Sequence, residues 1–224
     1  MKERGMIFNS EMVRAILDGR KTQTRRIMKE QPVLNGNFYE VFGSAWSKGM
    51  TSIPAVPGHS LSTRCPFGAV GDRIWVRETF CPVDDTQYGG EKWVDYRATP
   101  RYEASHPAGW DSAPNDAEAL KWRPSIHMPR WASRILLEIT DVRVERLNAI
   151  SEEDAIAEGM QGVICPCCKG DSEYSTSQYD AETLAVVDEI PCRACESNRS
   201  KFFTLWDSIY GYGQHCIGEW VWVI

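Results

Sequence analysis

The segment GRKTQTRR, residues 19–26, combines a lysine, two threonine hydroxyls and three arginines within eight positions. A threonine hydroxyl is a weak nucleophile at neutral pH and needs a base within hydrogen-bond reach, a role that a neutral lysine can fill. Partial burial and the neighbouring arginines would both lower the lysine pKa from its usual value of about 10.4. Lys21 and Thr24 are therefore a candidate catalytic pair. The alternative is that this basic turn is a solvated edge that binds phosphate.

Cysteines supply the second pattern, because four of them form two Cys-x-x-Cys pairs separated by 23 residues. Two such pairs provide the four thiolates of a tetrahedral zinc site, which a reducing cytosol favours over paired or free thiols. Four thiolates close the coordination sphere, so the predicted zinc is structural and no cofactor is expected for catalysis. Cys167 is a spare that could replace a ligand of the first pair. The predicted ligands are Cys165, Cys168, Cys192 and Cys195.

The three remaining cysteines are isolated in the sequence. We interpret them as small apolar residues: Cys65, Cys81 and Cys216.

A third group of polar side chains lies in WRPSIHMPRWASR, residues 122–134. Its serine, histidine and arginines stand between two tryptophans, a mixture that suits a base stacked beside a phosphate. His127 could instead be a satisfied structural histidine. Together with two arginines from other segments, these donors are predicted to line one ligand cleft: Arg26, Arg77, Ser125, His127 and Arg130.

Positioning Lys21 requires a helix before it and a strand after it. Apolar residues recur at helical spacing behind Ser10, which is a suitable N-cap, and Gly19 supplies a left-handed stop. The segment TQTRRIM, residues 22–28, then reads as a strand. The candidate pair would therefore lie at a turn between a helix and a strand.

The rest of the chain reads as short strands, two further helices and long loops. Ser151 and Asp154 resemble a capping box, and Ser197 or Asn198 begins a helix that continues through FFTLWDSIYG. Residues 31–70 and 81–121 read mostly as loop. The predicted strands are 73–80, a possible short one at 92–98, one long strand or bent pair at 133–147, and 219–224. Core tryptophans are expected at Trp206, Trp220 and Trp222.

This pattern predicts a mostly β fold with α elements (α+β), in the form of a small barrel with flanking helices and long loops. Parallel α/β layering is not supported. We expect residues 1–160 and 198–224 to form one domain. Residues 161–197 would be an inserted cysteine-rich, zinc-binding subdomain.

Composition limits the partners. The 224 residues are 42% hydrophobic and carry a net charge of -6, which argues against a protein that coats a long duplex. Residues 1–30 hold eight basic against four acidic residues, whereas residues 151–200 hold three against eleven. A small anionic ligand or a short nucleic-acid segment suits the basic end. The absence of a long apolar run predicts a cytoplasmic protein without membrane contact.

Five segments, in this order, resemble the ASCH domain in the form found in phage and prophage proteins: ILDGRKTQTRR, VGDRIWVRETF, WRPSIHMPRWASRILLEITDVRVERL, ISEEDAIAEGM and LWDSIYG with WVWVI. The match covers roughly 110 residues. The resemblance implies a PUA-like β-barrel with a cleft for RNA, a nucleotide or a modified base. It also implies a phage- or prophage-encoded protein in the cytoplasm of a bacterial host.

Small bacterial ASCH enzymes hydrolyse the amide of N(4)-acetylcytidine with a lysine, a threonine and a glutamate. The resemblance places the first two roles on Lys21 and Thr24, and we assign the third to Glu78, with Glu152 and Glu153 as alternatives. Other ASCH domains bind or cleave RNA. A non-catalytic reader of RNA or of a nucleotide, or a ribonuclease, is therefore the alternative function.

Overall fold

The computed structural model describes two compact units, each assembled from two separate stretches of the chain. Unit 1 comprises Met1–Gly19 and Pro66–Asp141, and unit 2 comprises Arg20–Cys65 and Val142–Ile224. The described residues are 1–41, 51–54, 65–84, 86, 90–102, 121–171, 173–175, 182 and 189–224.

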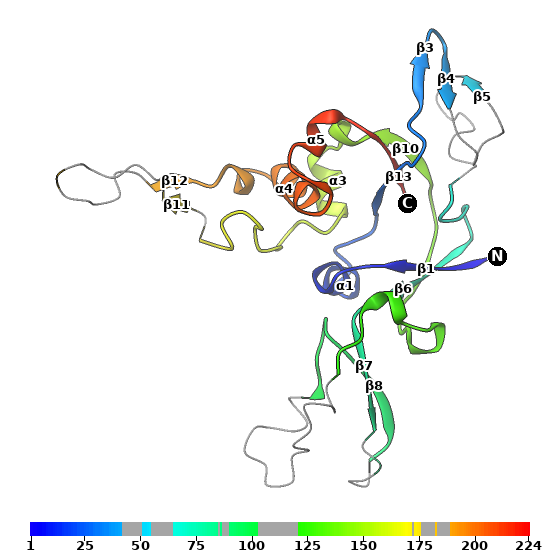
Figure 1. The fold of residues 1–224 in the computed structure, drawn as a ribbon, viewed down its shortest axis with the longest axis vertical. Coiled ribbons are helices and arrows are strands. Elements are labelled where there is room, and N and C mark those ends of the chain that lie inside the picture. The colour runs from blue at the N-terminus through cyan, green and yellow to red at the C-terminus, as the bar shows by residue number, and fades with distance from the viewer. Residues whose placement is uncertain are drawn as a thin grey trace. The chain divides into compact units, whose positions relative to one another are not determined.

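Unit 1 is built on a three-stranded sheet in the order β1-β6-β9. Strand β1 runs parallel to β6 and lies beside it (Figure 1), while β9 pairs antiparallel with β6. A second, two-stranded sheet joins β7 and β8. The elements of this unit are β1 (Glu3–Ile7), α1 (Ser10–Leu17), β6 (Arg73–Arg77), β7 (Phe80–Asp84), β8 (Lys92–Tyr96), η3 (Ser125–His127), η4 (Arg130–Ala132) and β9 (Leu136–Glu138).

Unit 2 is built on the antiparallel sheet β10-β13-β2. Helix α3 packs against α4 (Figure 1), and two smaller antiparallel sheets join β3-β4-β5 and β11-β12. Its elements are β2 (Arg25–Ile27), β3 (Val33–Asn35), β4 (Phe38–Val41), β5 (Thr51–Pro54), β10 (Arg143–Arg146), η5 (Leu147–Ala149), α3 (Glu152–Ala157), β11 (Glu173–Ser175), β12 (Glu189–Pro191), η6 (Arg193–Cys195), α4 (Asn198–Tyr210), α5 (Gln214–Ile217) and β13 (Trp220–Val223).

Helix α1 ends immediately before the segment that carries Lys21. Its N-cap is Asn9, whose side-chain oxygen accepts a hydrogen bond from the Met12 amide at 2.8 Å, so the prediction of Ser10 as the cap is wrong by one residue. The predicted stop is confirmed, because Gly19 has a φ of 73°, a conformation that favours glycine. The chain therefore leaves the helix at Gly19 and turns.

In the core of unit 2, β13 packs against helices α3 and α4. Val221 and Val223 pack with Leu147, Phe202 and Trp206 in one buried cluster. The three tryptophans predicted to be core are confirmed, since each is at most 8% exposed: Trp206, Trp220 and Trp222. This packing holds β13 in place as the central strand to which β2 pairs.

The structure confirms a mixed fold of small sheets and short helices, as expected for α+β. It also departs from the sequence-based assignment in several places. Strand β1 was not predicted, and three strands occupy the region around residues 33–54 that was read mostly as loop. The segment 133–147 forms two separate strands, β9 and β10, that belong to different sheets. The remaining predictions for residues 42–50, 55–64 and 103–120 fall outside the described residues.

In the part of the chain that the structure describes, no helix combines the length and the apolar character needed to cross a bilayer.

Candidate functional site

Lys21 lies in the interior of unit 2 rather than on a solvated edge. Its side chain is only 2% exposed. The ammonium group donates to three oxygens: Glu158 Oε2 at 2.7 Å, the Glu158 carbonyl at 2.9 Å and the Gln23 carbonyl at 2.8 Å. The alternative interpretation of the basic turn as a solvated edge therefore does not apply to Lys21.

Arg25 is the second buried cation of the cluster. Its Nη1 lies 3.2 Å from Glu158 Oε1, so one carboxylate joins Lys21 and Arg25. Its Nη2 lies 3.2 Å from Glu145 Oε2 and 3.2 Å from Asp154 Oδ2. Two cations thus face three carboxylates, as buried charges require partners to offset their desolvation.

The backbone that carries Lys21 is fixed by the C-terminal end of α3. Lys21 forms an antiparallel bridge with Glu158, the C-cap of α3, and the amides of Thr22 and Gln23 both donate to the Ala157 carbonyl. A helix C-terminus presents carbonyl oxygens with partial negative charge, which attract an ammonium group. The turn after Gly19 therefore places Lys21 next to the C-terminal end of α3.

Thr24 follows at the start of β2 and is 6% exposed. Its amide donates to the Ile224 carbonyl at 2.9 Å, and the Ile224 amide donates back to the Thr24 carbonyl at 3.1 Å. This pairing extends the β2–β13 ladder by one residue pair and fixes the backbone of Thr24 three positions after Lys21.

The pKa of Lys21 is lowered. Burial is the largest cause, because removal from water disfavours the charged amine, and the neighbouring Arg26 and Arg25 act in the same direction. The adjacent Glu158 carboxylate opposes this shift through its charge and its hydrogen bond. A buried amine next to a carboxylate is suited to exchange a proton with it.

The two alternative glutamates have different surroundings. Glu152 accepts hydrogen bonds from the backbone amides of Asn198 and Arg199, at 2.8 and 2.9 Å, and these bonds are the largest causes of its lowered pKa. Its carboxylate therefore satisfies the N-terminus of α4. Glu153 is an exposed residue of the same helical turn.

Glu78, the glutamate chosen from the sequence, lies in unit 1 and is 1% exposed. It forms a two-pronged ion pair with Arg134, with Nε–Oε1 at 2.9 Å and Nη2–Oε2 at 3.0 Å. The same guanidinium lies over the Tyr96 ring, 3.9 Å from its centroid. Its predicted role beside Lys21 stays a prediction, since Lys21 belongs to the other unit.

Unit 1 brings together most of the residues predicted to line a ligand cleft. Arg77 donates through Nε to the Ser125 carbonyl at 3.2 Å and through Nη2 to the Ile126 carbonyl. His127 ends the same short helix, η3, and is exposed. Arg130 follows in η4 and pairs with Glu3 at 2.9 Å on the surface of the unit. Arg26 lies in β2 of unit 2, opposite Trp222, so a single cleft shared with Arg26 stays a prediction.

The two Cys-x-x-Cys pairs converge in unit 2, where all four Sγ atoms lie within 4.8 Å of one another. Cys165 and Cys192 are separated by 3.8 Å between sulfur atoms, and Cys168 and Cys195 by 3.5 Å. A tetrahedral zinc with bonds of about 2.3 Å separates its sulfur ligands by about 3.8 Å. The cluster can therefore hold a metal ion such as zinc. Cys167 is exposed and is not part of the cluster.

The thiols of this cluster also affect one another's ionisation. The hydrogen bond with Cys168 is the largest cause that raises the pKa of Cys195, to about 12. Because a metal takes thiolates as ligands, binding at this cluster would release protons.

Comparison of the chain with protein-family models, with curated proteins and with solved structures found no match. A proposal of function therefore rests on the site itself, a buried pair of Lys21 and Glu158 with Thr24 three residues after Lys21, together with a four-cysteine cluster.

Sequence reasoning missed Glu158 as the partner of Lys21, although one signal was available. Glu158 is the last acidic residue of the segment SEEDAIAEG and the C-cap of α3, and an acidic residue at a helix C-terminus is unfavourable for the helix dipole. Such a position indicates a compensating cation, and the densest group of cations in the sequence is residues 20–26, which hold four in seven positions.

Proposed function

We propose that this chain is an ASCH-type hydrolase with a PUA-like barrel, and that it cleaves the amide of N(4)-acetylcytidine or a closely related acylated base. The observation that carries the proposal is the 2.7 Å pair between Lys21 and Glu158, buried three residues before Thr24. The resemblance to ASCH enzymes implies a catalytic lysine, threonine and glutamate, and Lys21, Thr24 and Glu158 all belong to unit 2.

Glu158 is the glutamate of this proposal, in place of Glu78. Its Oε2 accepts a hydrogen bond from Lys21 Nζ at 2.7 Å, whereas Glu78 belongs to unit 1 and pairs with Arg134. A carboxylate in contact with the catalytic amine can receive its proton and return it later in the reaction. Glu158 therefore acts as the proton shuttle.

In the proposed reaction the neutral amine of Lys21 takes the hydroxyl proton of Thr24, and the oxygen attacks the acyl carbon. The carbon–nitrogen bond breaks and the departing amine of cytidine takes a proton from the Lys21–Glu158 pair. Water then hydrolyses the acetyl ester on Thr24, which releases acetate and restores the hydroxyl. In a close variant, Lys21 activates the water directly and Thr24 only orients the substrate.

The proposed substrate is a modified nucleoside, a nucleotide or a short RNA. Arg77, Ser125, His127 and Arg130 of unit 1 are proposed to bind it through hydrogen bonds and charge, and Arg26 of β2 in unit 2 is proposed as a separate contact. Arg77 also lies over the Trp75 ring, 5.4 Å from its centroid, and Trp131 is 71% exposed. An exposed aromatic ring beside cations is suited to stacking on a base.

Release of acetate from N(4)-acetylcytidine tests the proposal. Lys21→Ala and Thr24→Ala should each lower turnover by about 100-fold or more, while Thr24→Ser should retain part of the activity. Comparison of Glu158→Gln with Glu78→Gln identifies the glutamate, because the larger loss of turnover marks the one that takes part. Glu138→Gln, at an exposed position of β9, serves as the control. Full turnover in Lys21→Ala, or none in the wild type, would refute the mechanism.

A non-catalytic reader of RNA or of a nucleotide is the second candidate, and one observation favours it. All three protons of the Lys21 ammonium are already donated to oxygens of the chain, an arrangement that also suits a purely structural ion pair. A reader would bind N(4)-acetylcytidine or a short RNA without releasing acetate. Cleavage of labelled RNA would instead identify a ribonuclease.

The zinc that the four cysteines would hold has a structural role in this proposal. Four thiolates leave no coordination position for water or substrate, so the ion would stabilise the fold of the cysteine-rich segment without taking part in the reaction. The ligands are Cys165, Cys168, Cys192 and Cys195.

A further inference from the structure

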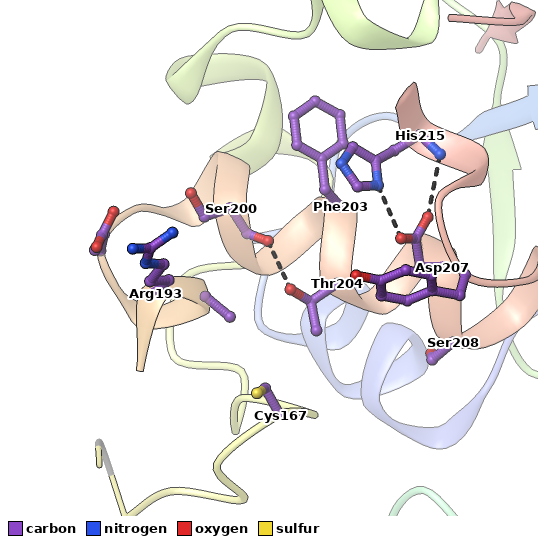
Figure 2. A pocket seen from close by; sticks show the side chains of 11 residues that line it. Cys167, Arg193, Ser200, Phe203, Thr204, Asp207, Ser208 and His215 are labelled. Carbon is purple, nitrogen blue, oxygen red and sulfur yellow. Dashed lines mark hydrogen bonds and ion pairs between the residues drawn. The ribbon is translucent and has the colours of Figure 1, made fainter. Parts of the chain in front are cut away.

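A pocket of about 630 Å³ lies beside α4 in unit 2, and none of its lining residues belongs to the proposed hydrolase site. Its lining is largely apolar and aromatic, with a few hydroxyl groups and charged groups. Figure 2 shows Phe203, Thr204 and Asp207 on α4 with His215 next to them. The pocket is large enough for a small organic molecule.

His215 is held in one orientation inside this pocket. Its Nδ1 lies 2.8 Å from Asp207 Oδ2, and its ring stacks on Phe203 with centroids 4.8 Å apart and planes at 22°. The Asp207 carboxylate also accepts the backbone amides of Gly213 and His215 (Figure 2 shows the contacts to His215). A side chain with both an ion-pair partner and a ring contact has little rotational freedom.

The pairing with Asp207 decides which ring nitrogen of His215 can act as a base. A carboxylate only accepts hydrogen bonds, so Nδ1 carries the proton in this contact, and Nε2 of the neutral ring is left as the acceptor. Cys216 Sγ lies 3.2 Å from Nε2. The thiol, the imidazole and the carboxylate thus form a relay in which the base is next to the thiol and the carboxylate orients the base.

The hydrogen bonds that Asp207 accepts favour its charged form. Burial raises its pKa, but the hydrogen bonds from His215 and from the two backbone amides outweigh burial, so the pKa of Asp207 is lowered overall. Its side chain is 12% exposed, while Cys216 is exposed. The carboxylate is therefore protected inside the unit, and the thiol is open to a reagent.

We propose that Cys216, His215 and Asp207 form a second nucleophilic site, which takes an activated acyl compound such as an ester or a thioester. The non-reacting part of that compound would occupy the pocket beside His215. Nucleophilic thiols in proteins share this arrangement of a base within hydrogen-bond reach that is itself oriented by a third group. The isolated cysteine that the sequence suggested to be a small apolar residue is, in this structure, an exposed thiol with a base beside it.

The reaction at this site balances without a cofactor. The Cys216 thiol gives its proton to His215 Nε2 while Sγ forms a bond to the acyl carbon. The bond from that carbon to the leaving group breaks, and the leaving alcohol or thiol takes the proton from Nε2. The products are an S-acyl cysteine and the free alcohol or thiol, and water can later hydrolyse the thioester to release the acid and restore the thiol.

Acetylation of the full-length protein by p-nitrophenyl acetate tests this proposal. The rate is followed by p-nitrophenolate release, and mass spectrometry of proteolytic peptides identifies the acetylated residue. Cys216 should carry the acetyl group, and Cys216→Ser should lose it. His215→Asn and Asp207→Asn should each slow acetylation of Cys216 by about tenfold or more, because they remove the base or its orientation.

Two controls separate chemistry from folding. Ile209→Ala changes an exposed residue of the same helix that does not line the pocket, and it should leave the rate of acetylation unchanged. A synthetic peptide of residues 211–219 contains the same His–Cys pair without Asp207, so its thiol gives the rate expected without the relay. Acetylation of Cys216 no faster than in the peptide, or unchanged in a folded His215→Asn variant, would overturn the proposal. Neither outcome depends on acetate release from N(4)-acetylcytidine.

Discussion

Glu158 has two cationic partners in the interior of unit 2, and this arrangement governs what substitutions there would do. Lys21 and Arg25 each contact a different oxygen of its carboxylate. Arg25 has two further carboxylates, whereas the acidic contact of Lys21 is Glu158. Removal of Glu158 therefore leaves Lys21 without an acidic partner among the contacts described above, while removal of Lys21 leaves Glu158 with Arg25.

Glu158→Gln is expected to destabilise the protein more than Lys21→Met. A buried charge left without its partner costs about 3–5 kcal/mol, which is the expected loss for Glu158→Gln. Lys21→Met should cost less, because Arg25 still neutralises the glutamate. Urea unfolding of both variants and of the double variant measures the difference.

The double variant provides the control for this prediction. A coupling between positions 21 and 158 should make the double variant less destabilised than the sum of the single variants. Equal, additive losses would show that the two side chains do not depend on each other.

At the scale of elements, α1 begins at two neighbouring residues, Asn9 and Ser10, whose side chains could each cap a helix. Asn9→Ala should lower the free energy of unfolding by about 1 kcal/mol, because it removes the side-chain oxygen that accepts the Met12 amide. Ser10→Ala should have little effect, since Ser10 is the first residue inside the helix. Thermal or urea unfolding of the two variants checks that Asn9 is the N-cap. A larger loss of stability for Ser10→Ala would show that Ser10 is the cap, as the sequence predicted.

We expect the protein to lose stability in acid because two carboxyl groups in the first turn of α3, those of Glu152 and Asp154, have lowered pKa values. Burial raises the pKa of Asp154, but a hydrogen bond from Gln23 and the charge of Arg25 outweigh it, and the pKa of Glu152 is lowered chiefly by the amides of α4. A carboxyl with a lowered pKa in the folded state stabilises the protein above its usual pKa, here 3.8 for aspartate and 4.5 for glutamate. That contribution is lost as the pH falls through the folded-state values.

Urea unfolding at two pH values measures this effect. The double variant Glu152→Gln with Asp154→Asn should be less stable than the wild type at pH 6, and the difference should shrink as the pH falls below the usual carboxyl pKa values. If the stability difference between the double variant and the wild type does not change with pH, it comes from altered packing and not from the charge of the two carboxylates.

At the scale of the whole molecule, each unit is closed by contacts between stretches far apart in sequence. Strand β1 pairs with β6 in unit 1, and β2 pairs with β13 in unit 2. The cysteine cluster joins residues on both sides of a 23-residue gap inside unit 2 in the same way. A metal at the cluster would therefore act as a local cross-link.

Protein purified without added zinc is expected to contain about one equivalent of it. A chelator should raise amide hydrogen exchange in residues 163–171 and 189–197 and leave the β10-β13-β2 sheet protected, because in small sites the metal supplies folding free energy. Elemental analysis and hydrogen exchange measure the two effects.

Cys192→Ser and Cys167→Ser form the matched pair for the metal prediction. Cys192 belongs to the cluster, so its replacement should remove the metal, whereas Cys167 lies outside it and its replacement should not. A protein without metal whose cysteine-rich segment is nevertheless fully protected would contradict the prediction.

The sequence by itself determined features that follow from local backbone preference or from the spacing of metal ligands. The capping box of Ser151 and Asp154, the stop at Gly19 and the convergence of the four cysteines are all confirmed. The capping box and the stop follow from local backbone preference, and the cysteine cluster follows from a ligand spacing that spans a 23-residue gap.

Only the tertiary structure decided which distant residues meet. Lys21 and Glu158 are separated by 137 positions. The acidic residue at the end of α3 indicates a cation nearby, but it does not identify Lys21 among the bases of the chain. The same holds for β1, whose parallel pairing with β6 depends on the packing of the whole unit. Pairing between residues so far apart in sequence depends on which side chains and charges the whole fold buries together. Local residue propensities carry no information about this.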